Sequence, residues 1–183
     1  MKFTAFAALI GILFGINGAA LAAPQNNKLA SLLNQANQIN NEEQDMAKEL
    51  KSKAGDNQAL VTMAETIKGD HQANQDALEK LASEKNITLD SYKENKAADN
   101  RLDQLNGAAF NSAFLNMQVR DHEKALSLFR HEKGSFSNDP EVQVYIDQTI
   151  PVLEAHLKMA QNLRSDDQRL GSHENPANNK NSD

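Results

Sequence analysis

Residues 109–129 read AFNSAFLNMQVRDHEKALSLF and have the pattern of an amphipathic helix. Their apolar side chains recur at intervals of three and four, so they share one helical face. That face carries Leu115, Val119, His122, Leu126 and Phe129. A helix with an apolar face packs against other helices, and here the face also holds a histidine. The stretch therefore predicts a core-facing helix that turns one imidazole inward.

Three other segments repeat this pattern. An Asn or Asp before a helix can cap its N-terminus, and Pro is favoured at the first helical position. Such signals predict helices over residues 27–53, after Gly55-Asp56-Asn57, and from Asp139-Pro140. The second of these helices breaks at residues 86–90, and a short amphipathic helix is predicted over residues 91–105. The helix quoted above begins after Asn106-Gly107 and ends near Gly134.

The fold class predicted from these segments is all-α. The links between the first and second long helices, and between the third and fourth, are short, whereas about twenty residues bridge helices 2 and 3. One long crossover of this kind is typical of a ferritin-like four-helix bundle, which we expect to span residues 23–169. An up-and-down bundle with a decorated loop is the alternative.

Both ends of the chain differ in composition from the bundle. Lys2 precedes an apolar run, and Ala20-Leu21-Ala22 offers the small residues that a signal peptidase reads. We therefore expect residues 1–22 to be a cleaved signal peptide and the mature protein to be periplasmic, with no membrane segment after cleavage. A membrane anchor is the alternative. Residues 170–183 are rich in Asn, Ser and charge, which predicts a disordered polar tail.

Charge and motifs exclude several kinds of function. The net charge is −6, and no basic patch is interleaved with aromatic residues, so a nucleic-acid partner is not expected. No nucleophile elbow and no glycine-rich phosphate loop occurs in the sequence. The sequence therefore does not indicate an enzyme, and no catalytic residue is predicted.

Four ionisable side chains stand on the apolar faces of the four helices, namely Glu43, His71, His122 and His156. Neutral imidazole binds zinc, copper, iron or nickel, and a carboxylate can complete such a site. Bundle cores build metal sites from side chains on facing helices. The four residues therefore form a candidate site for a divalent transition metal, in which Asp70 and Asp121 could orient the adjacent imidazoles from outside.

Spacing sets limits on this interpretation. The chain lacks the Glu-x-x-His pairs of di-iron carboxylate proteins. Folding helices 3 and 4 about residue 136 leaves His156 about 9 Å deeper than His122, opposite Met117, unless Pro151 kinks the last helix. The alternative function is a structural or stress-protective interaction protein, in which the buried histidines form a hydrogen-bond network.

Two long segments resemble a known family. They are residues 109–129 and residues 139–163, the latter reading DPEVQVYIDQTIPVLEAHLKMAQNL; the segment that ends at Asp70-His71 fits as well. These residues are similar to the bacterial domain of unknown function 4142, a group of exported ferritin-like helical proteins. The resemblance implies a fold, a compartment and the set of histidines, but no reaction. Where the family commonly shows Phe-Asp followed by Tyr, this chain has Phe110-Asn111 and Phe114.

Overall fold

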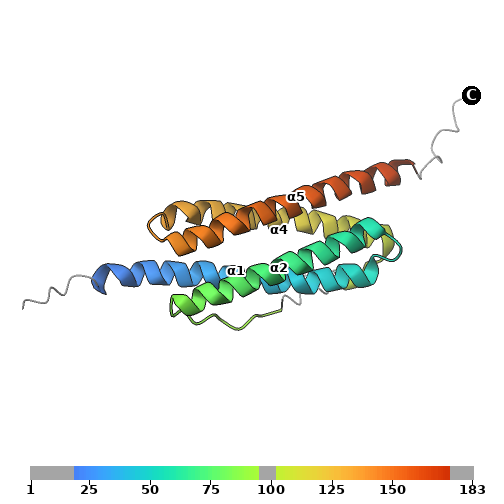
Figure 1. Ribbon diagram of the computed structural model, residues 1–183. Helices are drawn as coiled ribbons and strands as arrows, with labels where there is room; N and C mark the ends of the chain where they lie inside the picture. The colour runs from blue at the N-terminus through green and yellow to red at the C-terminus, as the bar shows by residue number, and fades with distance from the viewer. Residues whose placement is uncertain (1–18, 95–101, 174–183) are drawn as a thin grey trace, which may run out of the picture.

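The computed structural model describes residues 19–94 and 102–173, with side chains described for residues 25–94 and 102–169. Four long helices make up nearly all of this part of the chain, which contains no strand (Figure 1). They are α1 (Ala19–Lys53), α2 (Gln58–Glu84), α4 (Gly107–Ser135) and α5 (Pro140–His173). The all-α prediction is confirmed.

The predicted helix boundaries follow from local chemistry. Gly55 lies in the turn between α1 and α2 and has a φ of +56°, a conformation that favours glycine. Asn57 is the N-cap of α2, because its side-chain oxygen accepts a hydrogen bond of 3.2 Å from the Leu60 backbone N–H. Asp139 accepts one of 3.3 Å from Val142 in the same way, directly before α5.

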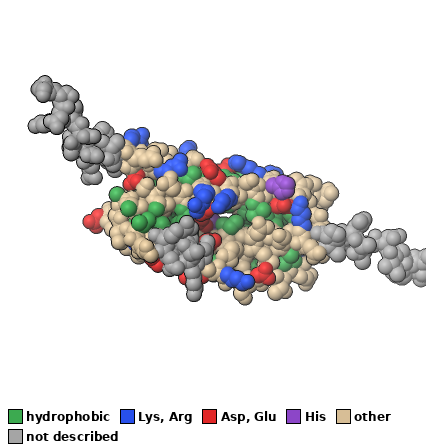
Figure 2. Space-filling view, turned by 180° about the vertical axis from the view of Figure 1, so that it is seen from behind, with side chains coloured by type: hydrophobic (Ala, Val, Ile, Leu, Met, Phe, Trp, Pro, Cys, Tyr) green, Lys and Arg blue, Asp and Glu red, His purple; other side chains and the backbone are tan. Residues whose placement is uncertain are grey.

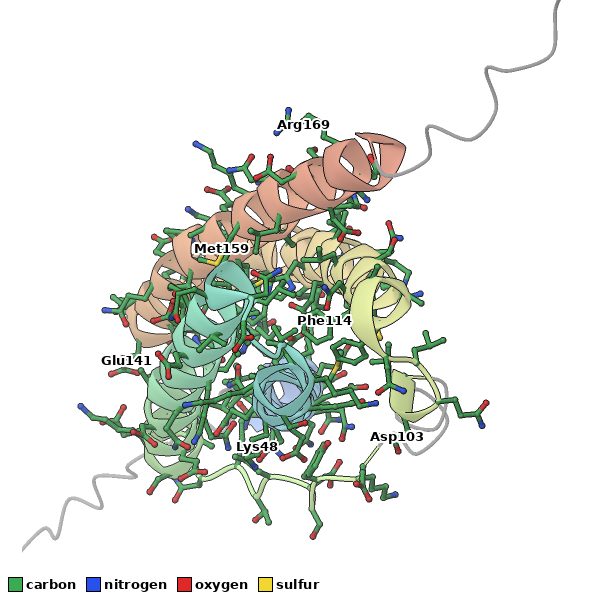
Figure 3. All side chains as sticks on the ribbon, turned by 90° about the vertical axis from the view of Figure 1, so that its right-hand side faces the viewer. Lys48, Asp103, Phe114, Glu141, Met159 and Arg169 are labelled. Carbon is green, nitrogen blue, oxygen red and sulfur yellow. The ribbon has the colours of Figure 1, made fainter. Side chains whose placement is uncertain are left out.

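The helices form two antiparallel pairs, α1 with α2 and α4 with α5. Seen along the bundle, α2 faces α5 and α1 faces α4, so the four helices stand at the corners of a square (Figure 3). The helices α2 and α4 run in the same direction, which requires the chain to return along the whole bundle between them (Figure 1). This is the ferritin-like connectivity with one long crossover, and the up-and-down alternative is wrong.

The crossover is not helical where it leaves α2. Residues 87–94 carry no regular structure, so the helix predicted over residues 91–105 is wrong for residues 91–94. Residues 95–101 lie outside the described part, and residues 102–103 are helical. Side-chain amides of α1 bind this segment instead. Asn34 and Asn37 hydrogen-bond the N–H and C=O of Asp90 at 2.8 Å each, and Gln38 binds the backbone of Lys93. Such bonds satisfy the backbone as a helix would.

The core consists of two apolar clusters with polar side chains between them. The first cluster, at the Phe129 end, contains residues such as Leu32, Leu81, Phe129, Phe136 and Ile146. The second cluster, at the Phe114 end, contains residues such as Leu50, Met63, Ile67, Phe110 and Phe114. The buried polar residues of the described chain lie between the two, and we call them the central polar layer: Asn37, Asn40, Glu43, His71, Gln75, Gln118, His122, Thr149 and His156.

The ends of the chain are described only in part. The helix α1 begins at Ala19, earlier than the predicted residue 27, and α5 continues to His173, into the segment predicted as a tail. Residues 1–18 and 174–183 lie outside the described part, so the signal peptide and the disorder of the tail stay predictions. Within the described helices, none is long and apolar enough to cross a membrane.

Candidate metal centre

Three histidines from three helices meet in the central polar layer. His71 of α2, His122 of α4 and His156 of α5 each offer one ring nitrogen, and these nitrogens lie within 4.8 Å of one another. One pair, His122 Nε2 and His156 Nδ1, is 3.3 Å apart. The three residues are 2%, 1% and 0% exposed. Among the described residues, this is the group of side chains whose ligand atoms could hold a metal ion together.

The positions of the two tight turns explain why the histidines share one level. His71 is thirteen residues after the start of α2 at Gln58, and Asn40 is thirteen residues before the end of α1 at Lys53. The two residues therefore lie at the same height, and they are in contact.

The prediction that His156 would lie too deep is wrong. The link between α4 and α5 covers residues 136–139, so the chain turns later than residue 136. Counting thirteen residues from Ser135 and from Pro140 puts His122 level with residue 153. Three residues then separate His156 from that level, about 4.5 Å along the axis, which two imidazole side chains can bridge. His156 therefore lies beside His122 and not opposite Met117 as predicted.

Each histidine uses its other ring nitrogen to bind an outer partner. His71 Nδ1 lies 3.0 Å from Asn40 Oδ1, and His122 Nδ1 lies 3.0 Å from the Gln118 backbone oxygen. His156 Nε2 lies 2.9 Å from a carboxylate oxygen of Asp70. All three outer atoms are oxygens that accept hydrogen bonds, so each of these ring nitrogens carries a proton and donates it.

The outer bonds decide which face of each neutral ring carries a lone pair. Since one nitrogen of a neutral imidazole is protonated and the other is not, the free lone pairs are on His71 Nε2, His122 Nε2 and His156 Nδ1. Of these atoms, His122 Nε2 and His156 Nδ1 lie 3.3 Å apart, and His71 Nε2 is buried with no hydrogen-bond partner. Three lone pairs facing each other without a cation or proton between them repel, and a buried acceptor without a partner is costly.

The spacing fits a metal ion. Two nitrogens bound at about 2.0–2.1 Å to a tetrahedral ion lie roughly 3.3 Å apart. This is the distance observed between His122 Nε2 and His156 Nδ1. Metal-bound histidines characteristically donate their second N–H to a carboxylate or carbonyl, and all three rings here do so to an oxygen. The donor set and its surroundings therefore suit a transition-metal ion.

Burial keeps two of these rings neutral. The pKa of His71 lies well below its usual value, first because burial disfavours the imidazolium, and then because His156 and His122 are close by. Burial also lowers the pKa of His156, although the Asp70 carboxylate opposes the shift. Neutral imidazole is the form that binds metal ions, so the rings are ready to act as ligands near neutral pH.

Glu43, the fourth predicted ligand, lies on the other side of His122. Its carboxylate Oε1 is 3.9 Å from His122 Nδ1, the nitrogen that faces away from the other two histidines, and it is not in the group of three. Gln118 donates a hydrogen bond of 2.8 Å to the second oxygen. Burial raises the pKa of Glu43, while His122 and the Gln118 amide lower it.

The two aspartates have different roles. Asp70 orients His156 across the bundle rather than its chain neighbour His71. Asp121 forms ion pairs with Arg120 and Lys124 at the surface, so its predicted orienting role at His122 is wrong. Asn40 and Gln118 were missed by the sequence prediction. Asn40 occupies a position three residues before Glu43 on the inward side of α1, which could have drawn attention to it.

The remaining histidines lie outside this group. The side chain of His131 is 76% exposed. His173 is the last residue of α5, beyond the residues whose side chains are described.

A ferritin-like four-helix bundle that gathers three buried histidines at its centre is the class of protein that this fold and site define. The family to which the chain belongs has a matching model over residues 17–163, described as a domain of unknown function (DUF4142). The resemblance found in the sequence is thereby confirmed. Neither a curated protein nor a solved structure matches the chain.

Proposed function

We propose that this is a periplasmic metal-binding protein that holds one divalent transition-metal ion through His71, His122 and His156. The observation that carries the proposal is the convergence of one ring nitrogen from each of three buried histidines, while the other nitrogen of each ring is bonded to an oxygen. A bound cation removes the repulsion between these lone pairs and satisfies the orphaned Nε2 of His71.

The ligand chemistry limits which metal ions the site would bind. Three neutral nitrogens and no thiolate favour borderline ions such as Zn²⁺, Cu²⁺ or Ni²⁺ over Mg²⁺ and Ca²⁺, which prefer oxygen ligands. Export supports the same role, because residues 1–22 have the features of a signal peptide and the mature chain would meet metal ions in the periplasm. Binding and storing or delivering an ion requires no further chemistry from the protein.

The test is metal content and metal-dependent stability of residues 23–183, purified from a periplasmic extract without chelator or nickel resin. We expect close to one transition-metal ion per chain, and a melting temperature that rises when Zn²⁺ is added to the stripped protein. An ion at 100 times its Kd stabilises the folded state by about 2.7 kcal/mol.

His122→Ala and His131→Ala provide a matched pair on the same helix. The first removes a central ligand and is expected to abolish the zinc-induced shift; the second changes an exposed ring and is expected to leave it intact. A metal-free protein whose melting temperature ignores Zn²⁺ would contradict the proposal. It would favour the alternative, a structural or stress-protective interaction protein with a buried hydrogen-bond network.

A further inference from the structure

The three histidines are closed off from solvent on most sides. Between α2 and α5 the layer is bridged by the Asp70–His156 bond and by Asn74, which donates 2.7 Å to the Thr149 hydroxyl. Between α1 and α2 it is bridged by Asn40, which binds His71. An ion that binds the histidines must therefore enter where the packing is more open.

The seam between α1 and α4 is that place. It contains a cleft of about 400 Å³ whose walls include Ile39, Met46, Met117 and Leu128, and whose lining also includes Glu43 and His122. The face formed by α1 and α4 is the one seen from behind the bundle, where a hollow opens near the middle with acidic and basic side chains beside it (Figure 2). The inner end of the cleft reaches Glu43 and His122, which are both buried.

The Glu43 carboxylate lies at the inner end of this cleft, 3.9 Å from His122 Nδ1. Glu43 is only 4% exposed, and its ion-pair partner within the described residues is His122 rather than a Lys or Arg. A buried carboxylate without a permanent cation is costly, because the interior solvates charge poorly. One amide, that of Gln118, donates to it. Such a carboxylate gains stability when it binds a cation.

We propose that metal ions enter through the cleft between α1 and α4, and that Glu43 is a transient ligand that passes the ion to His122, His156 and His71. The inference rests on the proposed function. It assigns Glu43 a role in transfer rather than in the final coordination sphere, since its carboxylate faces the opposite nitrogen of His122. A transient ligand lowers the barrier in both directions, so it changes rates more than affinity.

Stopped-flow binding of Co²⁺, which reports its own coordination by its visible absorbance, tests this with the mature chain. Glu43→Gln keeps the shape of the side chain and removes its charge. We expect Co²⁺ association and dissociation to slow by about tenfold or more, with a Kd within about threefold of the parent value. Glu123→Gln, an exposed change on α4, is the control and is expected to alter neither rate.

The absence of cysteine allows a second test that leaves the core untouched. Lys124 lines the cleft and its side chain is 69% exposed, whereas the neighbouring Glu123 is exposed and does not line it. A bulky methanethiosulfonate label on Lys124→Cys is expected to slow Co²⁺ entry, and removal of the label to restore the rate. The same label on Glu123→Cys is expected to have no effect.

The outcomes separate the two proposals. If the parent protein binds no Co²⁺, both the proposed function and the entry route are wrong. If it binds Co²⁺ and the Lys124→Cys label leaves the association rate unchanged, the route alone is wrong. If Glu43→Gln weakens the Kd in proportion to a faster dissociation, Glu43 is a resident ligand and the transient role is overturned.

Discussion

The two apolar clusters and the central polar layer are built from the same four helices, yet they stabilise the protein in opposite ways. The clusters at the two ends bury Leu, Ile, Met and Phe side chains, which supply the hydrophobic free energy of folding. The layer between them buries amides, a carboxylate and three imidazoles, which gain little by leaving water.

The layer is nearly, but not completely, satisfied. Amide groups bind one another across α1 and α2; Asn40 donates 2.9 Å to Asn74, for example, and Gln75 donates 2.8 Å to Asn37. Two atoms of the layer lack a partner, His71 Nε2 and Gln118 Oε1. The difference teaches that the apolar ends of the bundle stabilise the fold, while the middle leaves two buried polar atoms without a hydrogen-bond partner.

The largest expected effect is on the apolar side of this comparison. Phe114 is fully buried in the second cluster, and Phe114→Ala leaves a cavity there. We expect a loss of about 3–5 kcal/mol in the free energy of unfolding, measured by urea denaturation. The zinc-induced stabilisation, measured on the same variant, should stay unchanged, since the histidines are untouched. A variant that lost both would show that the clusters and the layer are not separable.

The next effect is on the polar side. Asp70 is 47% exposed and orients His156, so Asp70→Ala is expected to weaken zinc affinity by about 10–100-fold. It also removes the acceptor of the buried His156 Nε2–H, which is expected to cost about 1–3 kcal/mol of stability. Isothermal titration calorimetry with Zn²⁺ measures the affinity, and Asp76→Ala, an exposed change on the same helix, is the control. Asp70→Asn, which still offers an oxygen acceptor, should recover part of the affinity. Equal affinities for all three variants would exclude an orienting role.

The same contrast explains what the sequence could predict about the fold. Apolar spacing and end signals such as Asn57 and Asp139 determine the helices locally, so the four long helices, the two tight turns and the ferritin-like connectivity were accessible, whereas the start of α1 and the end of α5 were not. The path of the crossover was not accessible from the sequence. Its extended path depends on amides of Asn34, Asn37 and Gln38, which lie more than fifty residues away in the chain, and local periodicity carries no sign of them.

The site was predictable in its residues but not in its chemistry. The three histidines stand on apolar faces, which is visible in the sequence. Whether His156 reaches His122 depends on the length of the link before Pro140. A shift of α5 by less than one helical turn along the bundle decides whether the two rings are in contact. The choice of Asn40 and the Gln118 carbonyl as outer acceptors fixes the tautomers, and it becomes visible only in three dimensions.

Acid should act on the layer and spare the clusters. The pKa values of His71 and His156 are lowered in the folded state, so as the pH falls these two side chains are protonated in the unfolded chain before they are protonated in the folded one. Their contribution to stability is therefore full above about pH 6.5 and is lost as the pH falls toward the lowered values. The raised pKa of Glu43 acts in the opposite direction, since the folded chain then takes up that proton first as the pH approaches 4.5.

Urea denaturation of the metal-stripped protein between pH 7.5 and pH 5 measures this balance. We expect a net loss of stability on acidification, because two imidazoles oppose one carboxyl group, and a steeper loss in Glu43→Gln, where the opposing contribution is gone. Constant stability over this range would mean that the buried rings are not held neutral.

The smallest expected effect concerns Gly69, which precedes Asp70 and His71 in the middle of α2. An added Cβ at this position would meet no atom within 4 Å, and the backbone does not have a positive φ there. Gly in a helix interior costs about 0.5–1 kcal/mol relative to Ala, because more backbone freedom is lost on folding. We therefore expect Gly69→Ala to stabilise the protein by about this amount in urea denaturation. If the extra backbone freedom serves the site, the same variant should also slow Co²⁺ exchange; if exchange is unchanged, Gly69 imposes a cost that neither the clusters nor the layer requires.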